Sequence, residues 1–203
     1  RGEDVHTAVA ARVFGVAPEA VTKDMRRQAK VINFGIIYGM GVNALKANLG
    51  GSRQEAVEFY RHYFETFPTV RAYLEKVKTE ARTKGYTTTW FGRRRYFAGL
   101  KSPIPYIRAM HERMAMNAPL QGTAADIVKL AMVAVDKLLI ERQLKNKIHL
   151  ILQVHDELIY EVAESVGEET LILIKTTMEE VVKNKAPIPF SVNHHSGRTW
   201  AEL

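Results

Sequence analysis

The sequence predicts an α+β fold in which helices dominate. Apolar residues recur at helical spacing through most of the first 84 residues. Two later segments, residues 86–97 and 148–163, are instead rich in β-branched and aromatic residues around central turns, a pattern typical of hairpins. The 203-residue chain, with 46% hydrophobic and 25% charged residues, has the composition of a globular protein rather than a disordered one.

Four helices are expected in the first part of the chain, and together they indicate a helical bundle. Residues at their ends support them: Ser52 stands where an N-cap is needed, Pro68 suits a first turn, and Gly85 suits the position after a last turn. The expected helices are Val5 to Phe14, Lys23 to Tyr38, Arg53 to Phe64 and Thr69 to Lys84.

The remainder is expected to combine hairpins with further helices. One hairpin is predicted from Tyr86 to Phe97, and a second in HLILQVHDELIYEV, with its His-Asp pair between the strands. Because proline disrupts a helix interior, the helical stretch from Ile104 to Lys145 is expected to break near Pro119 to Gly122. The last expected elements are a helix from Ser165 to Lys185 and a short strand near Phe190 to Asn193.

Composition excludes several classes of protein. The chain has no cysteine, which excludes disulfide scaffolds and thiolate metal sites and makes a reducing compartment the simpler expectation. The longest uncharged run, Val31 to Leu45, is shorter than the roughly 20 apolar residues that a membrane-spanning helix needs. No membrane partner is therefore expected.

The charge is unevenly distributed. The residues before Ile148 include 25 Lys and Arg against 13 Asp and Glu, whereas the residues from Ile148 onward include 4 against 9. A basic excess over most of the chain indicates a polyanionic partner such as a nucleic acid. Basic residues that merely solvate helices would give the same count, so charge alone leaves both interpretations open.

The stretch MRRQAKVINFGIIYGMG places its charges at one end and its rings at the other. Four of its side chains recur at every fourth position: Arg26, Lys30, Phe34 and Tyr38. On a helix they form one slowly drifting stripe, roughly 18 Å long, which matches an extended nucleoside triphosphate. The cations would then lie on phosphate and the rings on sugar and base. A plain amphipathic helix with a buried aromatic face is the alternative.

Two features of this stretch favour a ligand. A mid-helix glycine such as Gly35 costs about 1 kcal/mol relative to alanine, and basic residues in a first turn oppose the helix dipole. Gly35 and Gly39 also remove side chains that would prevent the close approach of another molecule. An anionic ligand at this helix would account for these unfavourable choices.

The segment RRQAKVINFGIIYG resembles motif B, the nucleotide-binding helix of family A DNA polymerases of the bacterial DNA polymerase I type. The resemblance implies that Lys30 contacts the triphosphate and protonates the leaving pyrophosphate, and that Arg26 contacts phosphate. It also implies that Phe34 packs on the incoming sugar and that Tyr38 lies near the templating base. His6 matches a family position near the outer phosphates.

The turn in QVHDELIYEV is a second candidate site. Two-residue turns normally recruit glycine or Asn-Gly, so His-Asp is a poor choice for turn geometry alone. A carboxylate on a hairpin tip can hold a hard cation such as Mg²⁺, with a solvated polar turn as the alternative. The segment resembles motif C of the same family. That resemblance implies that Asp156 binds the catalytic metal, that Glu157 lies beside it as a further candidate metal ligand, and that His155 contacts the primer strand.

The segment HERMAMNAPLQGTAADIVK places three polar residues at helical spacing: Arg113, Asn117 and Gln121. By themselves they are typical of an exposed polar face. The resemblance implies that they touch template and primer in the minor groove. Contacts there can sense correct pairing without reading sequence, because the acceptor pattern is degenerate.

One part of the family's catalytic set does not occur in this sequence. The second catalytic aspartate belongs to motif A, of the form DYSQIELR, whereas the other aspartates here lie in helical contexts: Asp4, Asp24, Asp126 and Asp136. The resemblance thus covers only the second half of a polymerase domain, and a DYSQIELR-like segment is expected before Arg1. Residues 1–100 are expected to be mainly fingers helices, and residues 101–203 the later part of the palm.

Three segments have a weaker interpretation. The basic run GRRR at residues 92–95 suits either phosphate contacts or simple solvation. The sequence Phe97-Ala98-Gly99 replaces a more polar, proline-containing turn of the family. His194 and His195 also depart from the family, and a surface pair is preferred over a metal site.

The sequence therefore predicts a fragment of a DNA-templated DNA polymerase that acts in replication or repair. The resemblance implies two Mg²⁺ ions in the complete enzyme, primer-template DNA and deoxynucleoside triphosphates as partners, and a monomer. It implies a cytoplasmic, nucleoid-associated location for a bacterial source, with organellar targeting as the alternative. The isolated chain, without the motif A aspartate, is expected to be a catalytically inactive nucleotide- or DNA-binding module. A single-subunit RNA polymerase is a further alternative, against which Glu157 and the Asn33-Phe34-Gly35 triplet favour the DNA enzyme.

Overall fold

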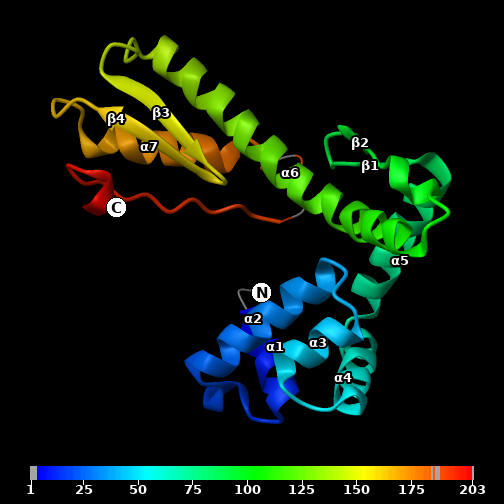
Figure 1. Ribbon diagram of the computed structural model, residues 1–203. Coiled ribbons are helices and arrows are strands. Elements are labelled where there is room, and N and C mark those ends of the chain that lie inside the picture. The colour runs from blue at the N-terminus through cyan, green and yellow to red at the C-terminus, as the bar shows by residue number, and fades with distance from the viewer. Residues whose placement is uncertain (1–3, 184, 186–187, 203) are drawn as a thin grey trace. The chain divides into compact units, whose positions relative to one another are not determined.

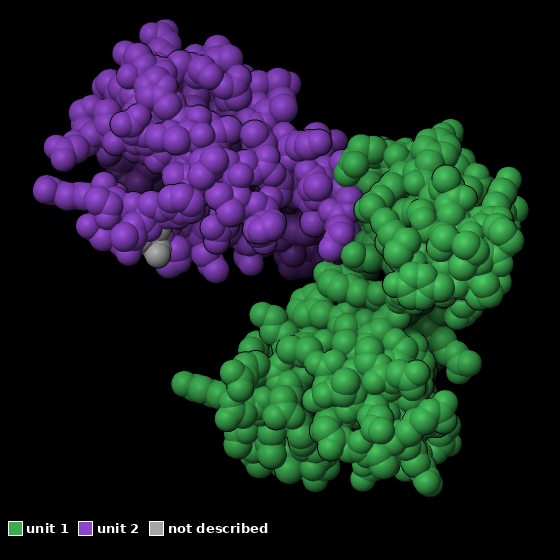
Figure 2. All heavy atoms as spheres, in the orientation of Figure 1, with its two compact units in different colours: residues 1–120 green, residues 121–203 purple. Residues whose placement is uncertain are grey.

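The structure is a computed structural model that describes residues 4–183, 185 and 188–202. It contains two compact units, residues 1–120 and residues 121–203, which Figure 2 shows in green and purple. Helices predominate, and the strands form two small antiparallel sheets (Figure 1). The predicted α+β class is therefore confirmed. No helix among the described residues is long and apolar enough to cross a membrane.

The first unit opens with five helices, which include the four that the sequence predicts. They are α1 (Val5–Phe14), α2 (Lys23–Ile37), α3 (Val42–Leu49), α4 (Arg53–Thr66) and α5 (Pro68–Lys84). Short polar side chains accept hydrogen bonds from first-turn amides at the starts of three helices: Asp4 at α1, Thr22 at α2 and Ser52 at α4. These caps explain why the helices begin where they do.

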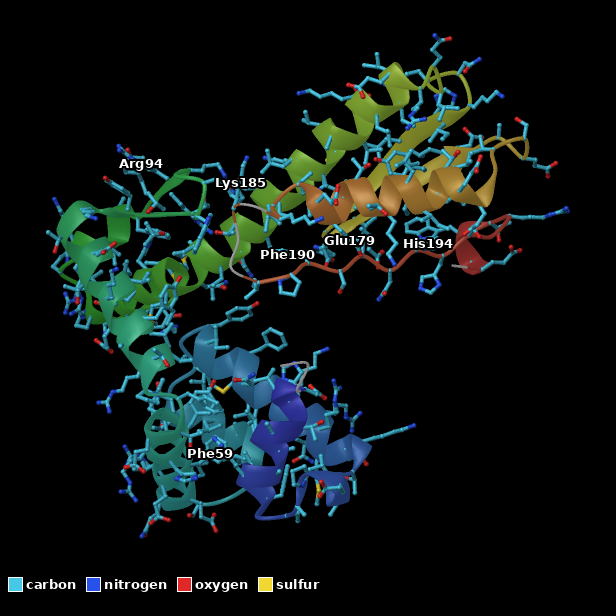
Figure 3. The ribbon with its side chains drawn as sticks, turned by 180° about the vertical axis from the view of Figure 1, so that it is seen from behind. Phe59, Arg94, Glu179, Lys185, Phe190 and His194 are labelled. Atoms are coloured by element: carbon cyan, nitrogen blue, oxygen red, sulfur yellow. The ribbon has the colours of Figure 1, made fainter. Side chains whose placement is uncertain are left out.

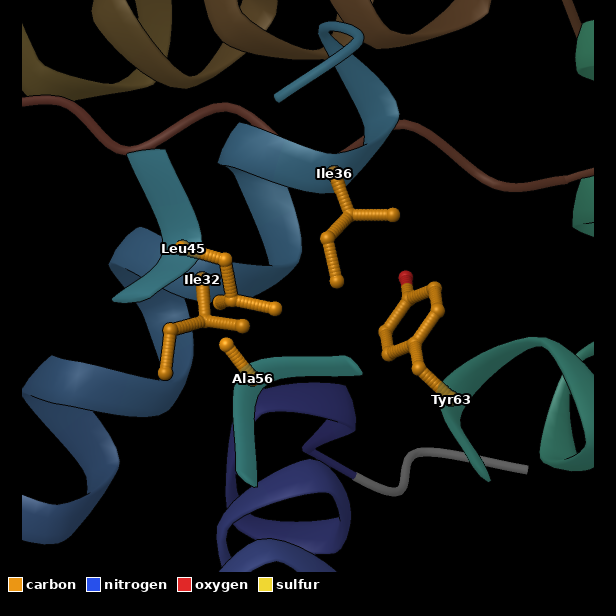
Figure 4. Packing of buried hydrophobic residues seen from close by; sticks show 5 residues of the cluster. All are labelled: Ile32, Ile36, Leu45, Ala56 and Tyr63. Carbon is orange, nitrogen blue, oxygen red and sulfur yellow. The ribbon is translucent and has the colours of Figure 1, made fainter. Parts of the chain in front are cut away.

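Helix α3 is missing from the sequence-based prediction, because its eight residues between Gly41 and Gly50 are too few to show a clear period. Its Leu45 is fully buried, and this burial rather than intrinsic propensity holds the short helix in place. The core cluster that it joins is shown in Figure 4 and consists of Ile32, Ile36, Leu45, Ala56 and Tyr63.

A buried side-chain hydrogen bond lies within this core. The hydroxyl of Tyr63 on α4 donates to Oδ1 of Asn33 on α2 at 2.5 Å, and both side chains are buried. Burial raises the pKa of Tyr63 to about 12. A second cluster, of Val9, Ala10 and Ala29, packs α1 against α2, where the alanines allow the helix backbones to approach closely. Helix α2 is thus fixed on two sides.

The predicted first hairpin is present after α5. Strand β1 (Tyr86–Thr88) pairs with β2 (Arg94–Tyr96) in antiparallel register, so that Tyr86 lies opposite Tyr96. The Arg94 guanidinium lies 4.8 Å from the centre of the Tyr86 ring, and Arg95 lies over Phe97. The basic run is therefore packed on aromatic rings within its own hairpin.

Helix α6 (Pro105–Glu141) is continuous through Pro119, so the predicted break near Pro119 to Gly122 is wrong. Proline removes one helical hydrogen bond and costs about 3 kcal/mol in a helix interior. The turn before it buries Ala115 and Ala118 in a cluster with Phe97 and Leu100, and such packing offsets the penalty. Tertiary packing here overrides a local signal.

The second unit contains the hairpin of β3 (Ile148–Val154) and β4 (Glu157–Val162), together with α7 (Glu168–Glu180). The antiparallel register shifts between Leu150 and Leu152, which leaves Ile151 as the extra residue of a bulge. A core of Val135, Leu139, Ile148 and Ile174 joins the hairpin to α7 and to the last turns of α6.

Two predictions for the chain end need correction. Helix α7 is shorter at both ends than the predicted Ser165 to Lys185. The strand predicted near Phe190 to Asn193 does not form; these described residues lie in an irregular segment beside α7 (Figure 3). There the amide of Val192 donates to Glu179 Oε1 at 2.8 Å. A side chain of α7 thus accepts a backbone hydrogen bond that would otherwise be made to a neighbouring strand.

Candidate functional site

The first candidate site is built where α1 begins beside the first turn of α2. Asp4 caps α1 by accepting from the amide of His6 at 3.0 Å and from the Thr7 hydroxyl at 2.8 Å. The Oδ2 atom of Asp4 also accepts from Nε of Arg26 at 2.5 Å. This hydrogen bond from Arg26 is the main reason that the pKa of the Asp4 carboxyl lies well below its usual range.

The predicted stripe lies along α2, although its last member is just outside the helix. Arg26, Lys30 and Phe34 are helical, whereas the helix ends at Ile37 and Tyr38 is its C-cap. The rings of Phe34 and Tyr38 are 5.9 Å apart between centroids and are 40% and 39% exposed, respectively. Because the buried core lies on the Ile32 side, these aromatic faces remain available to a ligand.

The backbone conformation just after α2 explains why residue 39 is a glycine. Gly39 has a φ of +81°, and the amides of Gly39 and Met40 donate to the carbonyls of Ile36 and Gly35, the pattern of a Schellman cap. A Cβ added at Gly39 would lie 2.9 Å from Cγ of Arg113 on α6. Glycine is thus required at this position by backbone conformation and by packing, in addition to any role in ligand approach.

His6 joins this group from α1. Its ring lies 5.3 Å from the Phe34 ring, and its buried Nδ1 has no hydrogen-bond partner among the residues that the structure describes. Burial lowers the pKa of His6; the Asp4 charge opposes this shift, and the charges of Arg26 and Lys30 add to it. Two cations near the His6 imidazole suit a site that receives an anion.

The predicted DNA-contacting residues all lie on α6. Arg113 is exposed and lies against Gly39, and Asn117 is partly buried with an Oδ1 that has no hydrogen bond in the described part of the chain. Gln121 is exposed and begins the second unit. The structure therefore brings Arg113 close to the end of the predicted nucleotide-binding helix.

The second candidate site is the β3–β4 turn, and its predicted geometry is confirmed. Val154 pairs with Glu157, so His155 and Asp156 form a two-residue connection, and His155 has a left-handed φ of +53°. The side chains of His155, Asp156 and Glu157 are all exposed. The side-chain amide of Gln153 donates to the His155 carbonyl at 3.2 Å and supports the turn.

The carboxylates of this turn are candidate ligands for Mg²⁺. Asp156 and Glu157 supply the hard oxygen donors that Mg²⁺ prefers. Among residues 4–183, 185 and 188–202, however, no three His, Asp or Glu side chains are grouped so that they could hold a metal ion. The donor type fits the ion, whereas the described residues bring together too few donors to hold it.

Other predicted residues have local partners. Asp24 pairs with Arg27 at 3.3 Å on the exposed side of α2, and Asp136 pairs with Lys145. His194 Nε2 lies 3.1 Å from Glu168 Oε1 at the start of α7, which ties the chain end to that helix (Figure 3). This contact agrees with a surface role for His194.

Sequence reasoning missed the role of Asp4. The Asp before VHTAV is a recognisable N-cap signal, but no local pattern links it to Arg26, which is 22 residues away. A cavity of about 610 Å³ between α1 and α4, lined by residues such as Val9, Phe59 and Phe67, was also not predicted. It contains none of the predicted site residues.

Comparison with known proteins gives a consistent result. Residues 1–202 match the family described as DNA polymerase family A. The chain is 46% identical over 203 residues to the thermostable DNA polymerase I of Thermus filiformis, covering 99% of this chain and 23% of that protein. It is 46% identical over 200 residues to the DNA polymerase I of Bacillus caldotenax, covering 98% of this chain and 22% of that protein.

A solved structure has a similar fold. It is the POL domain of Pol1 from M. smegmatis in complex with DNA primer-template and dNTP, with a TM-score of 0.82 and 42% identity. The similarity covers 89% of this chain and 31% of that one. The chain spans under a quarter of the length of the two DNA polymerase I relatives from Thermus filiformis and Bacillus caldotenax.

Proposed function

The chain belongs to DNA polymerase family A, and from this membership we propose that it supplies the nucleotide-binding part of a DNA-templated DNA polymerase. The observation that carries the proposal is the stripe on α2, in which Arg26 and Lys30 are followed by the exposed rings of Phe34 and Tyr38. A deoxynucleoside triphosphate has the same order of chemical groups. The polymerase would act as a monomer on primer-template DNA, the kind of ligand bound to the similar M. smegmatis domain.

Each side chain of the stripe has a distinct role in this proposal. Arg26 offers a planar guanidinium that can bind phosphate oxygens with two parallel hydrogen bonds. The Lys30 ammonium contacts the same triphosphate and donates a proton to the departing pyrophosphate oxygen. Phe34 packs on the sugar, Tyr38 lies near the templating base, and His6 contributes its imidazole near the outer phosphates.

The metal requirement is part of the same proposal. When bound, Mg²⁺ ions would activate the primer 3′ hydroxyl and stabilise the leaving oxygen. Asp156 would provide a ligand and Glu157 lies beside it, but the part of the chain that the structure describes brings together too few donors to hold the ions. For this reason we propose that the isolated 203-residue chain binds nucleotide or DNA without extending a primer.

The DNA side of the proposal involves α6 and the β3–β4 turn. Arg113, Asn117 and Gln121 are spaced by one helical turn each, so they can follow sugars and base edges along a groove. His155 at the turn would contact the primer strand. We expect Arg113→Ala to weaken primer-template binding, because the substitution removes the exposed guanidinium that would contact the DNA.

Primer extension tests the enzyme proposal. Extension by the complete polymerase that contains this chain, with none by the 203-residue chain alone, is the expected result. Arg26→Ala in the complete polymerase should raise the KM for every deoxynucleotide. Arg27→Ala is the matched control, because Arg27 is the neighbouring arginine and pairs with Asp24 on the exposed surface. Absence of extension by the complete polymerase would overturn the proposal.

A second test concerns the sugar. Phe34 has no hydroxyl, so a nucleotide that lacks its own 3′ hydroxyl loses a polar group that this ring cannot replace. We expect Phe34→Tyr to increase the acceptance of dideoxynucleotides relative to deoxynucleotides. The ratio of chain termination to extension measures this preference, and equal ratios for the two proteins would contradict the placement of Phe34 at the sugar.

A further inference from the structure

We propose that Asp4 is a positioning residue that orients the Arg26 guanidinium for the triphosphate. This inference rests on the proposed function and adds a residue to it. Asp4 itself would not touch the nucleotide. Its carboxylate would hold one edge of the guanidinium so that the opposite edge faces the ligand.

The contacts of Asp4 support this role. Its Oδ1 atom accepts from the His6 amide, and its Oδ2 atom accepts both from the Thr7 hydroxyl and from Arg26 Nε. The carboxylate is therefore fixed on α1 by two local bonds before it reaches α2. One side chain ties together the two elements that carry His6 and Arg26.

The Arg26 atom that Asp4 binds determines which guanidinium donors remain for a ligand. A guanidinium has five N–H donors, one on Nε and two on each Nη. Asp4 engages Nε, and no second hydrogen-bonding residue contacts the Arg26 side chain among the described residues. The edge formed by the two Nη groups is a different edge of the guanidinium and can make a planar, two-bond contact with phosphate oxygens. Lysine, which has no Nε edge to be held, could not be oriented in this way.

A competing effect has the opposite sign. The negative charge of Asp4 repels a triphosphate and partly neutralises the positive charge of Arg26. If charge alone mattered, removing the Asp4 carboxylate would tighten nucleotide binding. Positioning predicts weaker binding instead. The direction of the change in KM therefore separates the two interpretations.

The test uses two substitutions of Asp4 in the complete polymerase. Asp4→Ser retains a good helix cap but is too short to reach Arg26, whereas Asp4→Asn retains both the cap and a neutral acceptor. We expect Asp4→Ser to raise the KM for deoxynucleotides about 10-fold, the lower range for loss of an orienting partner. Asp4→Asn should give a smaller rise, and kcat should change much less than KM in both proteins.

Two controls exclude a merely structural effect. Asp24→Ser removes an exposed partner of Arg27 on the same helix and should leave KM unchanged. In an Arg26→Ala background, Asp4→Ser should change KM less than twofold, because the group that it orients is gone. Melting temperatures of the Asp4 variants should stay close to that of the parent, since both replacements cap α1.

The outcomes of the test can be separated. An unchanged or lower KM for Asp4→Ser, or an equal rise in the Arg26→Ala background, would overturn the positioning role and leave the proposed function intact. If Arg26→Ala itself left KM unchanged, the phosphate-binding role of this helix would fail first. A rise in KM for Asp4→Ser that disappears with Arg26→Ala supports the inference.

Discussion

The two candidate sites differ in how their side chains are held. At the α1–α2 junction, Arg26 is bound by Asp4, His6 packs on Phe34, and Phe34 lies beside Tyr38. At the β3–β4 turn, Asp156 and Glu157 extend from an exposed hairpin tip, and the Gln153 side chain donates a hydrogen bond to the His155 backbone.

This difference indicates what each region can do with its own residues. The first site lies on a helix whose other side is buried in two core clusters, so its geometry is set by the packing of its own unit. The second has a two-residue backbone connection, but no three His, Asp or Glu side chains among the described residues are grouped so that they could hold a metal ion. In the proposed function, nucleotide binding would therefore rely on residues of this chain more than metal binding would.

The largest effect is expected at the turn. Asp156→Asn removes the charge that the proposal assigns to metal binding, and primer extension by the complete polymerase should fall by at least about 10²–10³-fold. The melting temperature should not change, because the side chain is exposed. Glu164→Gln, also exposed and in the same unit, serves as the control and should retain full activity. Normal extension by Asp156→Asn would remove the turn from the active site.

A smaller effect is expected on the helix. Lys30→Ala should lower kcat by about 10²-fold through loss of the general acid, and should also raise the KM for nucleotide. Lys46→Ala on α3, an exposed lysine of the same unit, should be close to neutral. Single-turnover kinetics separate binding from chemistry here, and an unchanged rate constant for chemistry would exclude proton donation by Lys30.

The buried bond behind the helix should have a measurable stability effect. Tyr63→Phe leaves Asn33 Oδ1 buried without its donor and should lower the free energy of unfolding by about 1–3 kcal/mol. Tyr106→Phe, at a side chain that is 72% exposed, should change it by less than about 0.5 kcal/mol. Denaturant unfolding measures both. Equal values would show that the Tyr63–Asn33 bond does not stabilise this unit.

The last expected effect is a loss of stability at high pH. Burial raises the pKa of Tyr63 to about 12, and burial with the charge of Asp136 raises that of Tyr160 to about 12. A tyrosine in the unfolded chain ionises near pH 10, so between pH 10 and 12 the folded state binds more protons and stability falls as pH rises. Tyr63→Phe and Tyr160→Phe should each reduce this slope, measured by denaturant unfolding across that range. If neither substitution changed the dependence of the unfolding free energy on pH, the raised pKa values of Tyr63 and Tyr160 would be contradicted.

The sequence was most informative where local chemistry decides the structure. The limits of α1 follow from the helical spacing of its apolar residues, and the two-residue turn at His155 and Asp156 follows from the β-rich runs on either side of it; both are confirmed. Predictions from local sequence patterns failed where tertiary packing determines the secondary structure. Leu45 stabilises a helix that is too short to recognise, and buried Ala115 and Ala118 accompany a continuous helix at Pro119.

The same distinction applies to the candidate site. Regular spacing placed Arg26, Lys30 and Phe34 on one helix, because that depends only on helical geometry. The partner of Arg26 could not be predicted, since a contact between residues 22 positions apart depends on how α1 packs against α2. The roles of the site residues remain predictions for the experiments above.

The contact at Gly39 has a mechanical consequence. Because this residue has no Cβ, the backbone at the end of α2 rests directly against the stem of Arg113. The neighbouring Tyr38 is the residue proposed to lie near the templating base, and Arg113 is the one proposed to touch the DNA duplex. In the proposed function, a mismatched base pair that displaced Arg113 would therefore move a side chain that contacts the backbone next to Tyr38, which would couple the fit of the duplex to the position of Tyr38.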